Sequence, residues 1–291
     1  MGGMFGESKF EVLQKVPEAY KPKMLLIRVP TSCEEVMNGI VKSGLNFPLI
    51  FKPDLGERGW MVRRISNMAE MENYLRQIKV DFMIQELVDL PLEFGVFYVR
   101  YPSQPAGRVT SIVGKEMLSV AGDGTKTLRT LILEVDRAKL QWETLKVFYQ
   151  DQLEEVVPRG VKMELVSIGN HCLGTKFLDA NNLITDKLSS SFDQISKQIN
   201  GFYFGRFDLR VASLEDLENG KIMTLELNGC GAEPAHIYQP GFSFLKASGV
   251  LIRHWSDIYR VSRENHDRGV PYLSLREARD IYKKFKALTS A

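Results

Sequence analysis

Cysteine is scarce in this sequence, and the cysteines that occur form no metal-binding or disulfide pattern. Cys33, Cys172 and Cys230 are an odd number, lie far apart and include no CxxC pair. This spacing argues against a disulfide framework and against a zinc site. We therefore expect reduced thiols and a cytoplasmic protein.

Long apolar runs and an excess of one charge are also missing. No stretch approaches the roughly 20 apolar residues of a membrane helix, and the first residues lack a signal-peptide pattern. The 38 lysines and arginines are scattered and nearly balance the 36 acidic residues. This balance argues against nucleic acid or an anionic membrane as a partner. The expected partners are small molecules, and a homodimer remains open as an oligomeric state.

Capping patterns and hydrophobic spacing outline the secondary structure. Ser32-x-x-Glu35 and Asn67-x-x-Glu70 predict two helix starts in a small mixed lobe. A further helix is expected to begin near Thr125 or Thr127. Strands are expected at 24–29, 47–53, 60–66, 81–88, 93–102, 108–117 and 161–169, and helices at 186–199, 243–269 and 275–288. The last two helices are expected to pack over a larger lobe.

Two further strand-like segments carry polar side chains on one face. In the segment 201–210, a period of two places Arg206 and Asp208 together with Phe204 and Arg210. In the segment 223–229, the same period separates an apolar face from a polar face. The apolar face holds Met223, Leu225 and Leu227, and the polar face holds Thr224, Glu226 and Asn228.

The polar segment between these strands ends in Asn219-Gly220, a strong turn signal. The strands should therefore pair antiparallel, with Asp208 beside Glu226 and Asn228. Like charges held this closely repel, and a cation relieves the repulsion. Oxygen ligands suit a hard ion such as Mg²⁺, with Mn²⁺ as a substitute. The alternative is a surface hairpin with a solvated polar face.

A lysine and a glycine loop indicate a phosphate site. Lys52 ends an apolar strand, and the loop that follows contains Gly56 and Gly59. A lysine ammonium suits a phosphate, and glycines let backbone N–H groups approach its oxygens. This is not a Walker A motif, because GxxxxGK[ST] occurs nowhere in the sequence.

Two glutamates further along could contact a nucleoside. Glu86 ends a hydrophobic strand, and Glu93 follows seven positions later. They could contact an adenine amino group and a ribose hydroxyl, with backbone groups near Val88 completing the base contacts. Solvent-facing glutamates around a turn at Pro91 are the alternative.

The order of these motifs resembles the ATP-grasp superfamily, most closely carboxylate-amine ligases of the D-alanine-D-alanine ligase type. The resemblance runs from about Gly3 to Gly229, and its most specific part is G-R-x-D followed by L-E-x-N-G. It implies an α+β ATP-grasp fold without the N-terminal domain that usually precedes the small lobe. It also implies a small mixed lobe at 1–86, a larger antiparallel-sheet lobe at 87–250 and packed C-terminal helices at 251–291.

The resemblance also implies which residues hold ATP. Lys52 would hold the α- and β-phosphates, and Lys9 is similar to an earlier phosphate-side lysine of the small lobe. Glu86 and Glu93 are similar to the adenine and ribose contacts. The loop 55–59 would close over the phosphates.

For the chemistry, the resemblance implies that Asp208, Glu226 and Asn228 are magnesium ligands. Arg206 is similar to the family arginine that stabilises an acyl phosphate and the tetrahedral intermediate. Lys115 lies where the family places a γ-phosphate lysine. The implied reaction joins a carboxylate and an amine, on an amino acid or peptide-like substrate, through an acyl phosphate. An ATP-binding module without ligase activity, or a small-molecule phosphotransferase, are the alternatives.

Three further segments bear on the substrate. The segment Gly122-Asp123-Gly124 with Thr127-Leu128 resembles the GDG-x-x-T-[IL] element of ATP-grasp domains in cyanophycin synthetase, or it is a capped turn before a helix. GERGW replaces a serine-rich loop and GCGAEP replaces a Ser-Pro-Gly stretch, so D-alanine is not assigned as the substrate. His171 and His236 could contact a substrate or form loop hydrogen bonds.

Overall fold

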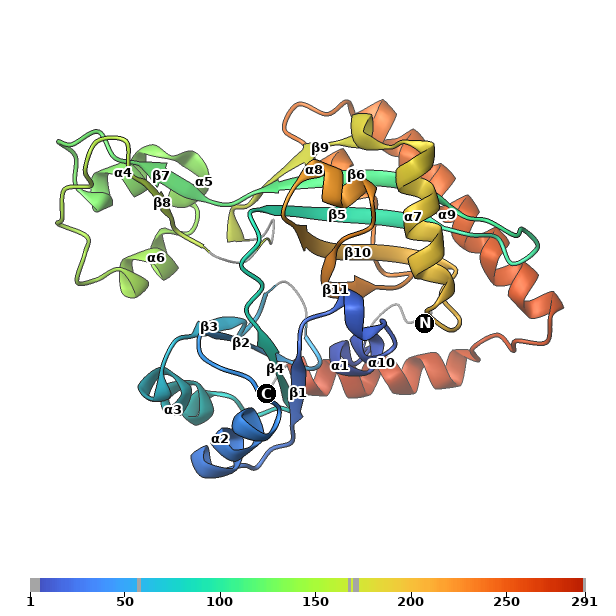
Figure 1. Ribbon diagram of the computed structural model, residues 1–291, viewed down its shortest axis with the longest axis horizontal. Coiled ribbons are helices and arrows are strands. Elements are labelled where there is room, and N and C mark those ends of the chain that lie inside the picture. Colours follow the sequence, from blue (N-terminus) through green and yellow to red (C-terminus); the bar gives the residue numbers. More distant parts are fainter. Residues whose placement is uncertain (1–5, 57–58, 167–168, 170–172, 290–291) are drawn as a thin grey trace. The chain divides into compact units, whose positions relative to one another are not determined.

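The computed structural model describes residues 6–56, 59–166, 169 and 173–289 (Figure 1). The chain divides into two compact units, of which unit 1 comprises residues 1–114 and 179–291 and unit 2 comprises residues 115–178. The predicted boundaries at 86/87 and 250/251 both fall inside unit 1, so this subdivision of the chain stays a prediction. Within the described ranges, no helix combines the length and the apolar character needed to cross a bilayer.

The first part of unit 1 is a four-stranded antiparallel sheet with two helices. The strand order is β1-β4-β2-β3. The strands are β1 (Met24–Ile27), β2 (Leu49–Pro53), β3 (Arg63–Ile65) and β4 (Phe82–Glu86), and the helices are α2 (Cys33–Lys42) and α3 (Met68–Gln77). A buried aromatic trio of Phe51, Tyr74 and Phe82 joins the sheet to α3. The predicted small mixed lobe is present.

Both predicted helix starts in this lobe are confirmed. The hydroxyl of Ser32 accepts from the backbone N–H of Glu35, whose carboxylate accepts from the N–H of Ser32. The side chain of Asn67 accepts from the N–H of Glu70. Each cap satisfies a backbone donor that the helix leaves unpaired, which stabilises the helix by about 1 kcal/mol.

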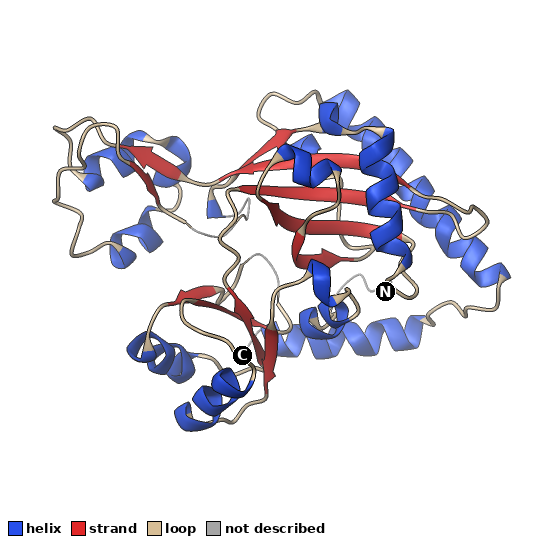
Figure 2. Cartoon of the chain, viewed as in Figure 1, coloured by secondary structure: helices blue, strands red, loops and turns tan. Residues whose placement is uncertain are grey.

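The second part of unit 1 is built on a five-stranded sheet (Figure 2). The strand order is β11-β10-β5-β6-β9. The strands are β5 (Leu92–Val99), β6 (Arg108–Glu116), β9 (Lys176–Asp179), β10 (Phe204–Val211) and β11 (Met223–Asn228), and the two main helices are α7 (Asp186–Lys197) and α9 (Phe244–Asp267). The division into units cuts β6 and β9, because unit 2 is inserted between them in the chain.

Each face of this sheet has its own core. Phe207 and Leu209 of β10 belong to the cluster that contains Phe192 of α7. Phe204, on the opposite face of β10, belongs to the cluster that contains Val261 of α9. Because side chains alternate along a strand, Arg206 and Asp208 lie on the α9 face. The structure therefore puts the predicted site on a defined face of the sheet.

The remaining elements of unit 1 are short, apart from the last helix. They are α1 (Lys9–Gln14), η1 (Glu18–Tyr20), η3 (Asn181–Leu183), α8 (Leu214–Glu218), η4 (Ala235–Tyr238) and α10 (Leu275–Thr289). The segment predicted as a turn between the two polar strands contains α8, capped by Ser213, before Gly220 adopts a left-handed φ of 70°. The tail packs as predicted through α9, whereas the described side chains of α10 are exposed apart from half-buried Ala278.

Unit 2 has a small core of its own. Its elements are β7 (Ser119–Ala121), α4 (Leu128–Glu134), α5 (Asp136–Lys139), α6 (Trp142–Phe148) and β8 (Lys162–Glu164). Thr127 caps α4, as one of the two predicted starts requires. The strand predicted at 161–169 is shorter than expected, and part of it lies outside the described residues.

Candidate functional site

The two polar strands pair as predicted. β10 and β11 are antiparallel, with Asp208 opposite Glu226 and Arg206 opposite Asn228. Opposite residues of an antiparallel pair point to the same side of the sheet. The pairing therefore brings the side chains of Asp208, Glu226 and Asn228 together, as the antiparallel model of the two strands requires.

A β-bulge interrupts the pairing beside these residues. Asp208 aligns with Glu226, but Leu209 aligns with Thr224, which leaves Leu225 as an extra residue in β11. The prediction that Thr224 shares the polar face is wrong, because the bulge turns it to the side of Leu209, and it is completely buried. Strict alternation cannot anticipate such an insertion.

Asp208 is the centre of a hydrogen-bond network in the site. Its side chain is buried, with 5% of the residue exposed. The Oδ2 atom accepts from Nε and Nη2 of Arg206, at 3.3 and 3.0 Å, and from Nδ2 of Asn228 at 2.8 Å. Burial acts to lower the pKa of Arg206, but the carboxylates of Asp208 and Glu226 together outweigh it and raise the pKa. The guanidinium is therefore a permanent cation beside the carboxylates.

Lys52 connects the small sheet to the bulge. Its Nζ donates to Oε1 of Gln85 at 2.9 Å and to the carbonyl oxygen of Leu225 at 3.1 Å. Gln85 also donates to this carbonyl, at 3.2 Å. Burial lowers the pKa of Lys52 to about 8, although the charge of Glu226 opposes the shift. Lys52 thus lies close to the carboxylates of the two polar strands.

Lys9 is the first residue of α1, and its ammonium reaches the glycine loop. Its Nζ donates to the carbonyl oxygen of Gly56 at 2.5 Å. Ser8, the N-cap of α1, donates to the buried carboxylate of Asp54 at 2.9 Å, which fixes α1 to the end of β2. Gly59 has a left-handed φ of 75°. Residues 57 and 58 of this loop lie outside the described residues.

The predicted nucleoside contacts are organised by an arginine that was not assigned. Glu93 is buried, and its Oε2 accepts from Nε of Arg210 at 2.9 Å. Nη1 of the same arginine donates to the carbonyl oxygen of Val88 at 3.0 Å. Glu86 is exposed, and its carboxylate accepts from the N–H of Lys23 at 3.2 Å. Arg210 could have been suspected, because it shares a predicted strand face with Arg206.

Lys115, His171 and His236 are the remaining predicted residues. Lys115 is half-buried in β6 and falls in unit 2, so its role as a γ-phosphate lysine stays a prediction. His171 lies outside the described residues. His236 is buried, and its Nδ1 lies 2.6 Å from the hydroxyl of Ser111. Its side chain therefore has the structural hydrogen bond that was the alternative to substrate contact.

Glycines make the close approach of the strands possible. A Cβ atom on Gly95 would lie 2.8 Å from Cγ1 of Val113 and 3.2 Å from both Cδ of Arg206 and Oδ1 of Asp208. A Cβ atom on Gly205 would lie 2.4 Å from the carbonyl oxygen of Asn228. The Gly205 position explains why a glycine precedes Arg206 in the motif. Gly95 was not singled out in the sequence.

The oxygen atoms of Asp208, Glu226 and Asn228 are suitable ligands for a hard metal ion. Asp208 and Glu226 supply carboxylate oxygens, and Asn228 turns its amide nitrogen toward Asp208, which leaves its amide oxygen for another partner. Among the described residues no cluster of three or more His, Cys, Asp or Glu side chains could hold a metal. The predicted set contains two such side chains and an amide, so it depends on substrate oxygens and water to complete a coordination shell.

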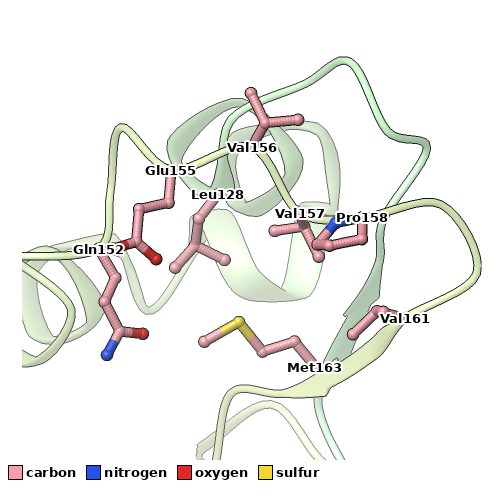
Figure 3. A pocket seen from close by; sticks show the side chains of 8 residues that line it. All are labelled: Leu128, Gln152, Glu155, Val156, Val157, Pro158, Val161 and Met163. Atoms are coloured by element: carbon pink, nitrogen blue, oxygen red, sulfur yellow. The ribbon is translucent and has the colours of Figure 1, made fainter.

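Unit 2 contains a small cavity of about 160 Å³ (Figure 3). Most of its lining is apolar, and the two polar side chains come from the segment before β8. The lining residues are Leu128, Gln152, Glu155, Val156, Val157, Pro158, Val161 and Met163. None of the residues predicted for the nucleotide or the metal is among them.

The GDG segment of unit 2 forms a capped turn. Oδ1 of Asp123 accepts from the N–H groups of Thr125 and Lys126, both at 2.8 Å, and from the hydroxyl of Thr125 at 2.9 Å. Gly124 has a left-handed φ of 80°. The structural alternative for this segment is therefore present, and its similarity to cyanophycin synthetase stays a prediction.

No protein-family model matches the chain, and no curated protein matches it. Solved structures of ligases do match. A D-Ala:D-Ser ligase from Enterococcus faecalis aligns over 88% of this chain and 62% of its own, with 11% identity and a TM-score of 0.49. A D-alanine–D-alanine ligase from Bacillus anthracis aligns over 91% and 69%, with 12% identity and a TM-score of 0.46.

A bifunctional glutathione synthetase from Pasteurella multocida aligns over 86% of this chain and 35% of its own, with 16% identity and a TM-score of 0.39. The chain therefore spans less than two thirds of this synthetase and of the D-Ala:D-Ser ligase. The α+β class predicted from the motifs is confirmed by the sheets and helices of the structure itself, whereas the matches carry no argument for a superfamily. Because every quoted TM-score is below 0.5, they assign no activity, and the functional case depends on the site residues.

Proposed function

We propose that this chain is an ATP- and Mg²⁺-dependent ligase that joins a carboxylate to an amine through an acyl phosphate. One arrangement carries the proposal: Asp208, Glu226 and Asn228 converge on one face of β10 and β11, with Arg206 hydrogen-bonded to Asp208. Buried charges are costly unless they are paired or bind an ion. Such a grouping is a reason to expect function.

The phosphates of ATP would lie between two lysines. Lys52 is buried beside the carboxylates, and the ammonium of Lys9 holds the backbone of Gly56. Each lysine donates hydrogen bonds that a phosphate oxygen can accept in place of a carbonyl. On the nucleoside side, Arg210 fixes the carboxylate of Glu93 and the carbonyl of Val88. A fixed carboxylate can accept from a ribose hydroxyl.

The residues that would hold Mg²⁺ are Asp208, Glu226 and Asn228. When bound, the ion would neutralise charge on the phosphate oxygens. Asp208 accepts from Arg206, so the arginine also orients this ligand.

The chemistry would proceed in two displacements. A carboxylate oxygen of the first substrate bonds to the γ-phosphorus, and ADP leaves with the electrons of the broken P–O bond. The amine nitrogen of the second substrate then bonds to the acyl carbon, inorganic phosphate leaves, and the nitrogen releases a proton. Arg206 would hold the negative oxygens of both steps, because a guanidinium stays charged and donates in a planar fork.

The test is a screen for ADP release with mixed amino acids and small carboxylates. We expect release with wild-type protein and its loss in Asp208→Asn and in Glu226→Gln. Asp151→Asn is the matched control, because Asp151 is exposed and belongs to a turn. Circular dichroism confirms that each variant is folded. Turnover that persists in both site variants would contradict the proposal.

The same screen separates the two alternative activities. A nucleotide-binding module would show a thermal shift with Mg-ATP but no ADP release with any acceptor. A phosphotransferase would release ADP and leave a phosphorylated product that hydroxylamine does not trap. A ligase gives an acyl phosphate, which hydroxylamine converts to a hydroxamate.

A further inference from the structure

The segment after the metal motif is held against Arg206. Nη1 of Arg206 donates to the carbonyl oxygen of Glu233 at 3.1 Å, while its other nitrogens donate to Asp208. The backbone of Glu233 is therefore fixed beside the cation that the proposed chemistry uses. Further along, His236 is buried in η4 and its ring lies within hydrogen-bond distance of Ser111 in β6. This contact anchors the segment to the sheet.

The carboxylate of Glu233 is accessible and is oriented by a tyrosine. The hydroxyl of Tyr238 donates to Oε2 of Glu233. Glu233 is half-buried, and Tyr238 is 44% exposed. Burial and the hydrogen bond to Glu233 raise the pKa of Tyr238 to about 12. The phenol therefore stays protonated, and it orients the carboxylate without neutralising its charge.

Glu233 differs from the other acidic side chains of the site in the charge of its partner. Asp208 is paired with Arg206, and Glu93 is paired with Arg210. Glu226 belongs to the proposed metal set. The carboxylate of Glu233 instead accepts a hydrogen bond from a neutral phenol. A carboxylate in this state attracts a cation, and it lies next to a guanidinium that attracts anions.

We propose that Glu233 binds the ammonium group of the amine substrate and that Tyr238 is the positioning residue for its carboxylate. The assignment rests on the proposed ligase function. The acyl phosphate is anionic and the waiting amine is cationic, so the second displacement needs one group of each charge side by side. Arg206 and Glu233 supply them from adjacent positions. The amine releases its proton to solvent before it attacks.

Hydroxylamine provides a direct test, because it is largely neutral near pH 7 and does not need a carboxylate to hold it. An equimolar mixture of the common L-amino acids with glycine and D-alanine supplies the substrates. ADP release with this mixture reports ligation, and added hydroxylamine reports the acyl phosphate as hydroxamate. The variants are Glu233→Gln and Tyr238→Phe. The control is Glu143→Gln, because Glu143 is exposed on α6.

In Glu233→Gln we expect ligation to fall at least about tenfold, which is the usual loss for a hydrogen bond to a charged group. Hydroxamate formation should change less than about twofold. In Tyr238→Phe we expect a fall of about threefold, visible as a higher half-saturating mixture concentration with unchanged maximal rate. Glu143→Gln should match wild type. Thermal unfolding checks that the variants are folded.

Unchanged ligation in Glu233→Gln, with hydroxamate formed by wild type, would overturn the Glu233 assignment and leave the ligase proposal standing. An equal loss of ligation and hydroxamate in Glu233→Gln would also overturn it, because the residue would then act before the amine binds. If wild type forms neither product, the proposed function fails and this assignment fails with it.

Discussion

Two aspartates of this chain, Asp123 and Asp208, each accept several hydrogen bonds at one carboxylate oxygen, but their donors and their burial differ. Asp123 of unit 2 accepts from Thr125 and Lys126, within three positions in sequence, and is half-exposed. Asp208 is buried, and it accepts from Arg206 in its own strand and from Asn228 twenty positions away. The same type of side chain thus organises a local turn at position 123 and a buried network at position 208.

The difference lies in what each network costs to build. A local turn around a half-exposed aspartate needs little desolvation, and the hydrogen bonds to backbone N–H groups offset that cost. A buried carboxylate beside a guanidinium, a lysine and a second carboxylate pays a large desolvation cost. A buried cluster of charges that lowers stability indicates a functional site. We therefore assign a role in the chemistry to Asp208 and a structural role in a turn to Asp123.

The largest expected effect is on turnover at the buried network. Asp208→Asn and Glu226→Gln should each lower ADP release at least about 100-fold, because each removes a charge on which the proposed site depends. Initial rates of ADP formation at saturating Mg-ATP measure it. Glu226→Gln is included because Asn at 208 leaves Arg206 buried beside a neutral group, which can lower stability.

Asp123→Asn is the matched control for this comparison. We expect wild-type rates, because Asp123 organises a turn through local hydrogen bonds. An equal loss of rate in this variant would erase the contrast between the two aspartates. It would favour instead the functional interpretation of the GDG segment.

A second prediction concerns the glycine beneath the buried network. Gly95→Ala should lower the free energy of unfolding by about 1–3 kcal/mol, the usual cost of overpacking, because the new methyl group would press on Val113, Arg206 and Asp208. Urea denaturation measures the change. Gly249→Ala is the control, since its Cβ would meet open space on α9. A gain of up to about 1 kcal/mol is expected there. Equal stability of the two variants would show that the site tolerates displacement.

A third prediction uses the pH dependence of nucleotide binding. Burial lowers the pKa of Lys52 to about 8, so its ammonium is charged below pH 8 and neutral above it. Affinity for Mg-ATP should therefore fall as pH rises through 8, by at most about tenfold per pH unit. Titration calorimetry from pH 7 to 9 measures it. In Lys52→Arg the fall should vanish, because a guanidinium stays charged, and a persisting fall would mean that another group titrates.

The smallest expected effect is at the exposed turn. Backbone hydrogen bonds from Lys126 and Thr125 lower the pKa of Asp123 to about 2. The carboxylate therefore stabilises the turn above its unfolded pKa of about 4, and the contribution is lost as pH falls toward 2. In Asp123→Ala, amide exchange at Thr125 and Lys126 should be faster at neutral pH, with unchanged Mg-ATP binding. Unchanged exchange would show that the turn forms without the carboxylate.

Local patterns predicted much of the fold. The capping box at Ser32 and the N-cap at Asn67 marked helix starts, because the cap residues and their partners are three positions apart. The pairing of Asp208 with Glu226 followed from strand periodicity and an intervening turn signal. Each of these features is encoded by neighbouring residues.

Other features depend on long-range packing and could not be predicted. The bulge at Leu225 appears when β11 pairs with β10, so Thr224 was put on the wrong face. Gln85 and Arg210 gain their roles from partners distant in sequence, Leu225 for the first and Glu93 for the second. The compact unit 115–178 is defined by contacts between residues that are distant in sequence. The hydrophobic pattern of one strand or helix does not reveal such contacts.

The extra residue in β11 has a consequence for how the site receives a ligand. The carbonyl oxygen of Leu225 accepts from Lys52 and from Gln85, so the ammonium keeps its partners before any nucleotide arrives. When a phosphate binds, the ammonium of Lys52 exchanges the carbonyl oxygen of Leu225 for a phosphate oxygen. The ammonium therefore does not have to lose bound water first. A neutral ligand offers no better acceptor than the carbonyl oxygen of Leu225, so the bulge favours the binding of anions at Lys52.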